Sequence, residues 1–371
     1  MELRDAVDGY ESWLANYMAL TADDLTRKHQ LMATAPFTFF RATYFRWSAQ
    51  WPTLSRPEDQ SAFPVLGVGD LHIENFGTWR DLEGRLIWGI NDFDEATRLP
   101  FSQDLVRLAA SAHLAIGAAH LTLRRRVATT AILDGYTEGL AAGGRPFVLE
   151  ENHEWLRAIV TSRLRNPIAF WNKLTALPAT TAPPAVRRLL AESLPRPGLR
   201  FRVAHRVAGL GSLGRPRYVA LADWNGGCVA REAKALAPSA WNPGAADGSR
   251  HAHYAEVLAT AIRIPDPSVR VTDAWIIRRL APHCTRIELV DLFRERDESR
   301  LLFAMGFETA NIHLGTPGAR VAISRDLKRR PSDWLHQAAK PFAEAVTTDW
   351  LAWKSRGQRR RRPGPGTVVR R

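Results

Sequence analysis

The hydrophobic and polar positions of this chain follow a helical period first and a strand period later. Apolar residues recur every three or four positions between residues 10 and 18, and this type of spacing predicts helices over residues 8–50. Continuous apolar runs at 65–68 and 86–90 predict two buried strands after these helices. From residue 201 to 233 apolar and polar residues alternate, which predicts three strands joined by turns. We therefore expect an α+β protein.

Prolines and composition divide the chain further. Five prolines between residues 178 and 197 surround one short helix and predict a linker. We expect a mainly helical lobe over residues 1–197 and a small antiparallel β lobe with one helix over residues 198–282. Helices over residues 283–355 are expected to return to the first lobe. Residues 356–371 have no apolar face and predict a disordered basic tail.

Two acidic motifs directly follow the two strands predicted in the first lobe. Residues 69–77 are GDLHIENFG, and residues 91–95 are NDFDE. An Asp with an Asn five positions later, and a second Asp one hairpin downstream, is the spacing with which kinase-like phosphotransferases hold a substrate hydroxyl and two magnesium ions. Asp104, at the start of a helix predicted over residues 99–120, is either a helix-start acid or an anchor for the backbone of the first motif.

Each residue of these motifs receives a predicted role. Asp70 and His72 are the predicted catalytic residues: Asp70 would accept or orient the proton of an acceptor hydroxyl, and His72 would brace the loop by a hydrogen bond. Mg²⁺ prefers oxygen ligands and needs few of them from the protein, because phosphate oxygens and waters complete its octahedron. We therefore predict Asn75, Asp92 and Asp94 as metal ligands.

A glycine-rich loop joins the first two strands of the predicted β lobe. Residues 209–214 are GLGSLG. A dinucleotide fingerprint would open a helix, whereas the loop that covers the nucleotide phosphates in kinases joins two strands. The loop therefore predicts binding of ATP or another nucleoside triphosphate by Gly209, Gly211, Ser212 and Gly214. A glycine-rich hairpin with no ligand is the alternative.

The third strand of a kinase β lobe carries a lysine for the nucleotide phosphates, paired with a glutamate on the next helix. In this chain the third strand contains Arg231, and Lys234 follows three positions later on the other face. A helix predicted over residues 249–262 contains Glu256. We predict Arg231 and Glu256 as the phosphate-binding pair.

Together these motifs resemble domain-of-unknown-function family 2252, a bacterial group in which Lys-Glu-Ala is common where this chain has Arg231-Glu232-Ala233. The acidic motifs are also similar to those of aminoglycoside and choline kinases. The resemblance implies a kinase-like, two-lobed fold, with magnesium and a nucleotide as cofactors and an unknown acceptor. In ordinary kinases the glycine loop precedes the catalytic Asp. Here it follows Asp70 by more than a hundred residues, so a circular permutation is expected.

Two other function classes compete with a phosphotransferase. A metal-dependent phosphoesterase could use Asp70 and His72 with two further motifs, Asn152-His153-Glu154 and His251-Ala252-His253. A non-catalytic protein that binds nucleotide or nucleic acid is the third possibility. The intact set of Asp70, Asn75 and Asp92 favours the enzyme.

Composition narrows the class of protein without naming a substrate. The 371 residues, 45% hydrophobic and 24% charged, are typical of a globular protein of two lobes. The sequence shows neither a long apolar stretch nor a leader, so we expect a cytoplasmic location and no membrane partner. The cysteines, Cys228 and Cys284, are too few for a disulfide framework. Eight of the net +13 charges come from residues 354–371, which predicts at most weak, nonspecific contact with nucleic acid.

Overall fold

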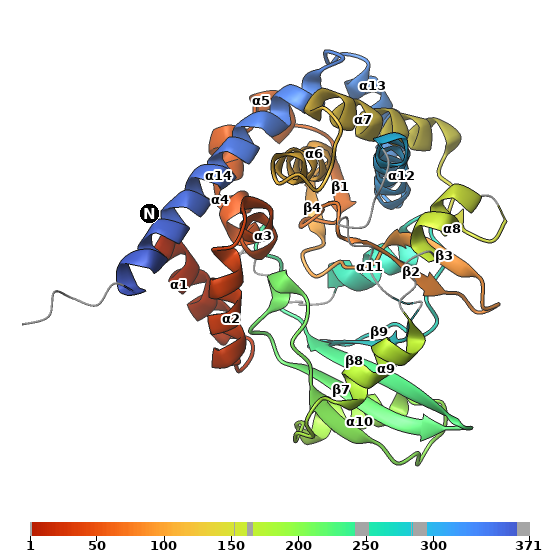
Figure 1. Cartoon of the computed structure of the whole chain (residues 1–371). Helices are drawn as coiled ribbons and strands as arrows, with labels where there is room; N and C mark the ends of the chain where they lie inside the picture. The colour runs from red at the N-terminus through yellow and green to blue at the C-terminus, as the bar shows by residue number, and fades with distance from the viewer. Residues whose placement is uncertain are drawn as a thin grey trace, which may run out of the picture.

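The computed structural model describes residues 2–151, 153–161, 166–241, 252–282, 284 and 295–361, and its fold is α+β, as predicted (Figure 1). Its helices are α1 (Leu3–Ala15), α2 (Ala22–Met32), α3 (Pro36–Ala42), α4 (Tyr44–Leu54), α5 (Pro57–Gln60), α6 (Phe101–Gly117), α7 (Arg125–Ala142), α8 (Glu154–Thr161), α9 (Pro167–Thr175), α10 (Pro184–Glu192), α11 (Ala252–Thr260), α12 (Glu295–His313), α13 (Ala319–Leu327) and α14 (Trp334–Arg361), with a short 3₁₀ helix, η1 (Leu210–Ser212).

The strands form three antiparallel sheets. They are β1 (Pro64–Gly67), β2 (Phe76–Arg80), β3 (Leu86–Ile90), β4 (Thr97–Pro100), β5 (Phe147–Val148), β6 (Arg202–His205), β7 (Arg217–Trp224), β8 (Gly227–Ala235), β9 (Arg270–Val271) and β10 (Trp275–Leu280). One sheet pairs β1 with β4, a second has the order β2-β3-β5, and the largest has the order β6-β7-β8-β10-β9. The predicted glycine loop lies between β6 and β7.

Helices α6, α7, α12 and α14 form the body that carries the first two sheets (Figure 1). Helix α6 is buried along nearly its whole length, and its buried residues include Gln103, Asp104, Arg107 and His113 beside the apolar and small ones. Helices α7 and α12 approach closely at two glycines: a Cβ on Gly135 would lie 1.9 Å from the carbonyl oxygen of Phe303, and one on Gly306 would lie 2.0 Å from that of Ile132. Helix α12 contacts both β1 and β3, so the helices position the ends of these strands.

The five-stranded sheet lies on the opposite side of the molecule from that helical body (Figure 1). Helix α10 buries Val186 and Leu190 against Val203 and Ala220 of the sheet, and α9 packs on the same sheet through Phe170. The segment predicted as a linker, residues 178–197, is therefore part of the packing of this sheet, and the sheet region begins earlier than residue 198. The short helix predicted between the prolines is α10, with Pro184 in its first turn, and the linker interpretation did not foresee that its apolar residues cover the sheet.

The helix predicted after the third strand is α11, and its Tyr254 and Val257 join the main core beneath the sheet. At the C-terminus α14 continues to Arg361, past the predicted boundary at residue 356, while residues 362–371 lie outside the described part of the chain. Within the described residues no helix combines the length and the apolar character needed to span a bilayer.

Candidate functional site

The first acidic motif is held by the first turn of α6. Asp104 accepts hydrogen bonds from the backbone N–H groups of Val68 (2.7 Å) and Gly69 (2.9 Å), at the end of β1. His313 Nε2 lies 3.0 Å from the same carboxylate, and Tyr136 contacts the other nitrogen of His313 at 2.8 Å. Asp104 is thus both a helix-start acid and an anchor, so both interpretations of its sequence position are confirmed.

The two acidic motifs pack directly against each other. Gly69 has φ +80°, and a Cβ there would lie 2.2 Å from the carbonyl oxygen of Glu95, so only glycine fits. Asn75 Nδ2 donates to the carbonyl oxygen of Asp70 at 2.7 Å, and the N–H of Asn91 donates to that of Asn75 at 3.1 Å. This places Asp70, Asn75 and the second motif around one point.

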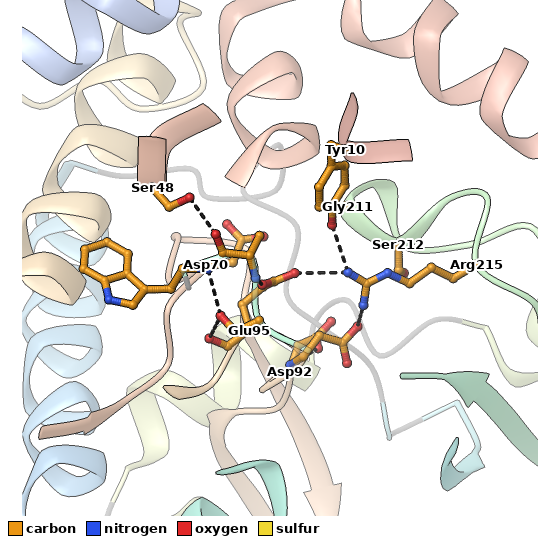
Figure 2. A network of polar contacts seen from close by, with 12 residues as sticks. Tyr10, Ser48, Asp70, Asp92, Glu95, Gly211, Ser212 and Arg215 are labelled. Atoms are coloured by element: carbon orange, nitrogen blue, oxygen red, sulfur yellow. Dashed lines mark hydrogen bonds and ion pairs between the residues drawn. The ribbon is translucent and has the colours of Figure 1, made fainter. Parts of the chain in front are cut away.

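The predicted site residues of both motifs, and three of the four predicted in the glycine loop, line a single pocket of about 60 Å³. Those it brings together are Asp70, His72, Asn75, Asp92, Asp94, Gly209, Gly211 and Ser212. Figure 2 shows the glycine loop beside the two carboxylates. A Cβ on Gly211 would lie 3.0 Å from the carbonyl oxygen of Arg41 and 3.6 Å from Asp70 Oδ2, so the loop approaches the first motif closely.

Asp70 is paired with Arg107 of α6, a buried arginine that was not predicted as a site residue. Arg107 Nε donates to Asp70 Oδ1 at 2.9 Å, and its Nη2 makes a second contact to the same oxygen. The guanidinium lies 4.0 Å from the ring centroid of Phe40 and is fully buried. Burial raises the pKa of Asp70 to about 6, although Arg107 acts in the opposite direction.

Lys234, on β8, is the cation that contacts both aspartates of the second motif most closely. Its Nζ lies 2.6 Å from Asp94 Oδ1 and 3.2 Å from Asp92 Oδ1, and its side chain is 1% exposed. Burial raises the pKa of Asp94, and the charge of Asp92 adds to this effect. Burial works against ionisation of Asp92 too, but Lys234 and Arg278 lower the pKa of Asp92 below its usual range. Asp92 therefore ionises more readily than Asp94.

Three predicted cofactor-binding residues lie elsewhere, and these predictions are corrected. Arg231 donates from Nε to the carbonyl oxygen of Ser193 (2.7 Å), on the side of β8 away from the acidic motifs. Glu256 forms a surface ion pair with Arg98 at 2.7 Å. Gly214, with φ +96°, packs against the side chain of Leu25 and does not line the pocket.

The reason for the correction at Arg231 is the alternation of side chains along a strand. Residues three apart on β8, such as Arg231 and Lys234, point to opposite faces. Which face meets the acidic motifs depends on how the sheet docks on the helical body, and the sequence of the strand does not specify this.

A second polar network, formed by Tyr10, Glu95 and Arg215, lies in the wall of the same pocket. Arg215 Nη2 donates to Glu95 Oε1 and to the hydroxyl of Tyr10, both at 3.1 Å (Figure 2). The N–H of Ala240 donates to Glu95 Oε2 at 2.6 Å. Burial raises the pKa of Glu95 to about 7 against the opposing charge of Arg215. Tyr10 and Arg215 come from segments distant in sequence, and no local signal marks them as site residues.

A larger cavity of about 330 Å³ adjoins the pocket between the five-stranded sheet and the helical body. The two spaces share Asn75, Asp92 and Gly209 in their walls. Apolar and aromatic side chains of both parts, among them Phe93 and Leu280, contribute to the lining. Its volume is within the range usual for small-molecule sites.

Asn75 and Asp92, two of the three predicted metal ligands, both line the pocket. Asn75 uses its Nδ2 group internally, which leaves its amide oxygen for a ligand, and the side chain of Asp92 is 38% exposed. Within the part of the chain that the structure describes, no group of three or more His, Cys, Asp and Glu is arranged to hold a metal ion. Of the predicted phosphoesterase residues, His153 lies against Phe147, while Asn152 and His251 are outside the described residues.

Comparisons with known proteins place the first part of the chain in context. A family model described as an uncharacterized protein conserved in bacteria (DUF2252) matches residues 21–166. This segment contains both acidic motifs and Asp104 but not the glycine loop. The match supports the predicted family relationship, and the description of the family gives no activity. No curated protein and no solved structure matches the chain.

The scaffold under the second motif predicts a specific pH dependence. Glu308 on α12 accepts from the N–H of Ile90 at 3.2 Å and from Asn311 Nδ2 at 2.7 Å, and burial raises its pKa to about 7. The folded state therefore holds a proton that the unfolded chain releases near pH 4.5, and the resulting stability is lost as the pH rises from about 4.5 through 7. Glutamine does not titrate, so between pH 4.5 and 7 the unfolding free energy of Glu308→Gln should fall by ~3 kcal/mol less than that of the wild type.

Denaturant unfolding of both proteins between pH 4.5 and 8 measures this difference. Glu344→Gln, which removes an exposed carboxylate of α14, is the control and should follow wild type. Parallel curves for wild type and Glu308→Gln would contradict the assignment.

Proposed function

We propose that this protein is a magnesium-dependent, nucleotide-binding phosphotransferase of the kinase-like type. The observation that carries the proposal is the convergence of Asp70, Asn75 and Asp92 with Gly209 and Gly211 on one pocket. The acidic motifs and the glycine loop are separated by more than a hundred residues of sequence. The acidic motifs and the glycine loop were each predicted from sequence to bind nucleotide phosphates or magnesium. If either were only a structural turn, we would not expect both to line the same pocket.

The topology of the sheet is a second support for a permuted kinase-like fold. The glycine loop joins the first two strands, β6 and β7, and Lys234 lies on the third, β8, as in the kinase arrangement. One helix, α11, follows this strand. The acidic motifs come first in the chain and the sheet later, and C-terminal helices α12 and α14 pack back on α7 and α6 of the first part. Permutation preserves such packing because only the surface connections change.

The proposed mechanism assigns a task to each side chain. Asp70, held by Arg107, orients the acceptor hydroxyl and accepts its proton. Asn75 and Asp92 would hold magnesium, which neutralises charge on the nucleotide phosphates when bound. Lys234 holds Asp92 ionised, and the glycine loop permits backbone N–H groups to approach the phosphates closely.

The direct test is incubation of the pure protein with ATP and magnesium, with separate labels on the α- and γ-phosphates. A phosphotransferase releases or transfers the γ-label, and a hydroxylated acceptor or the protein itself becomes labelled. Transfer of the α-label would indicate nucleotidyl transfer from the same site. Absence of nucleotide-dependent transfer, together with manganese-dependent hydrolysis of a phosphoester, would contradict the proposal.

The position of Lys234 gives a matched pair of variants. Lys234→Met should weaken binding of magnesium-ATP by at least about tenfold, because a charged hydrogen bond is lost inside the site. Arg231→Met removes a cation from the other face of the same strand and should leave the affinity within about twofold, since Arg231 contacts the backbone of Ser193 and does not line the pocket. Isothermal titration of both variants checks the result. Equal losses, or a larger loss for Arg231→Met, would return the phosphate-binding role to Arg231.

A further inference from the structure

A single buried carboxylate holds three arginines in the wall of the larger cavity. Glu232, fully buried on β8, accepts from Arg217 Nη1 at 2.9 Å and from Arg278 Nε at 2.9 Å through its Oε1 atom. Its Oε2 atom accepts from Arg206 Nη1. Arg278 is its cross-strand neighbour on β10, Arg217 begins β7 and Arg206 follows β6, so three strands converge on this group.

The charges of this cluster do not balance within the protein. One carboxylate faces three guanidinium groups, and all three arginines line the cavity. The other acids in the wall of this cavity are Asp92, Glu74 and Asp266, which pair with Lys234, Arg41 and Arg279. Burial, together with the charges of Arg278 and Arg206, lowers the pKa of Arg217 even though Glu232 acts in the opposite direction. Of the three arginines Arg217 is the buried one, and an excess of positive charge around it is unfavourable unless an anion enters.

The location of the cluster identifies the chemistry of that anion. Arg217 Nη2 donates to Ser212 Oγ of the glycine loop at 2.7 Å, so the cluster is linked to the pocket of the acidic motifs. The side chains of Arg206 and Arg278 are each 25% exposed and are accessible from the cavity. Guanidinium groups match phosphate oxygens with paired hydrogen bonds.

We propose that Arg206, Arg217 and Arg278, organised by Glu232, form a binding site for the polyphosphate chain of a nucleotide. This inference rests on the proposed function for the identity of the ligand, but not for the presence of an anion site. It places the polyphosphate along the sheet, beneath β8, and leaves the base for the aromatic part of the cavity.

Binding of ATP, tripolyphosphate and adenosine to the full-length protein tests the site. Wild type should bind ATP and tripolyphosphate, and both Arg206→Gln and Arg278→Gln should weaken these two ligands by at least about tenfold while leaving adenosine unchanged. Either variant leaves Glu232 with two arginine partners, so the fold should persist. Arg206→Lys and Arg278→Lys keep the charge but lose the paired geometry, and should bind with intermediate affinity.

Arg270→Gln is the matched control, because Arg270 lies on β9 of the same sheet and pairs with Glu192 at the surface. It should bind all three ligands as wild type does. Unchanged affinity of both Gln variants for tripolyphosphate and ATP would overturn the site. The outcomes separate the two proposals. If the variants weaken tripolyphosphate binding but the wild type does not turn over ATP, the anion site is supported and the proposed function is contradicted. If ATP is turned over equally by the wild type and the variants, the proposed function is supported and the anion site is contradicted.

Discussion

Asp92→Ala should abolish the stabilisation of this protein by magnesium and ATP. A ligand present at about a hundredfold above its dissociation constant raises the unfolding free energy of the wild type by ~2.7 kcal/mol, and the variant should show almost none of this gain. The reason is that Asp92 is the exposed, ionised carboxylate of the second motif and shares its pocket with Asn75 and the glycine loop. Lys234 keeps Asp94 as a partner when Asp92 is removed, so the fold should survive.

Thermal unfolding with and without magnesium-ATP measures the effect, and Asp223→Ala on the exposed end of β7 controls for loss of a carboxylate elsewhere on the sheet. A full ligand-induced gain in Asp92→Ala would show that Asp92 does not hold the metal.

Asp70→Asn should separate binding from turnover. Asp70 is assigned to the acceptor hydroxyl and not to the nucleotide, so magnesium-ATP should bind with nearly wild-type affinity while turnover falls by about 10²–10⁴-fold. Asparagine keeps an oxygen for Arg107, which limits the structural disturbance, although a buried charge pair is lost. Calorimetric titration and single-turnover assays on the same preparation check both halves.

Two results would contradict this role of Asp70. Turnover within about threefold of wild type would remove it from the reaction. Loss of nucleotide binding with intact fold would make it a metal ligand, as the phosphoesterase alternative requires.

The parts of the site that the sequence predicted are those encoded in short, contiguous motifs. The spacing of Asp70, Asn75 and Asp92 reflects a loop, a hairpin and a strand end, all of which are local, and the structure brings the three together. Asp104 was equally recognisable, because an acid at a helix start has few roles and both of them are local in space to the first motif.

The residues that sequence reasoning missed are determined by tertiary packing. Arg107 reaches Asp70 from one face of a helix that is buried on all faces, and Arg215 reaches Glu95 from the far end of the glycine loop. Lys234 and Arg231 lie on opposite faces of β8, and the face that carries Lys234 is the one that meets the acidic motifs. Contacts of this kind depend on how elements distant in sequence pack together, and the hydrophobic periodicity of the sequence does not predict that packing.

The measurement that tests the central claim most directly is equilibrium binding of ATP to the wild-type protein, with and without magnesium, followed by thermal unfolding at millimolar nucleotide. The proposed function predicts a nucleotide-dependent rise in unfolding temperature that is larger with magnesium and smaller with adenosine alone. No shift with ATP and magnesium would contradict the kinase-like assignment and leave the pocket around Asp70 and Asp92 without its proposed ligand.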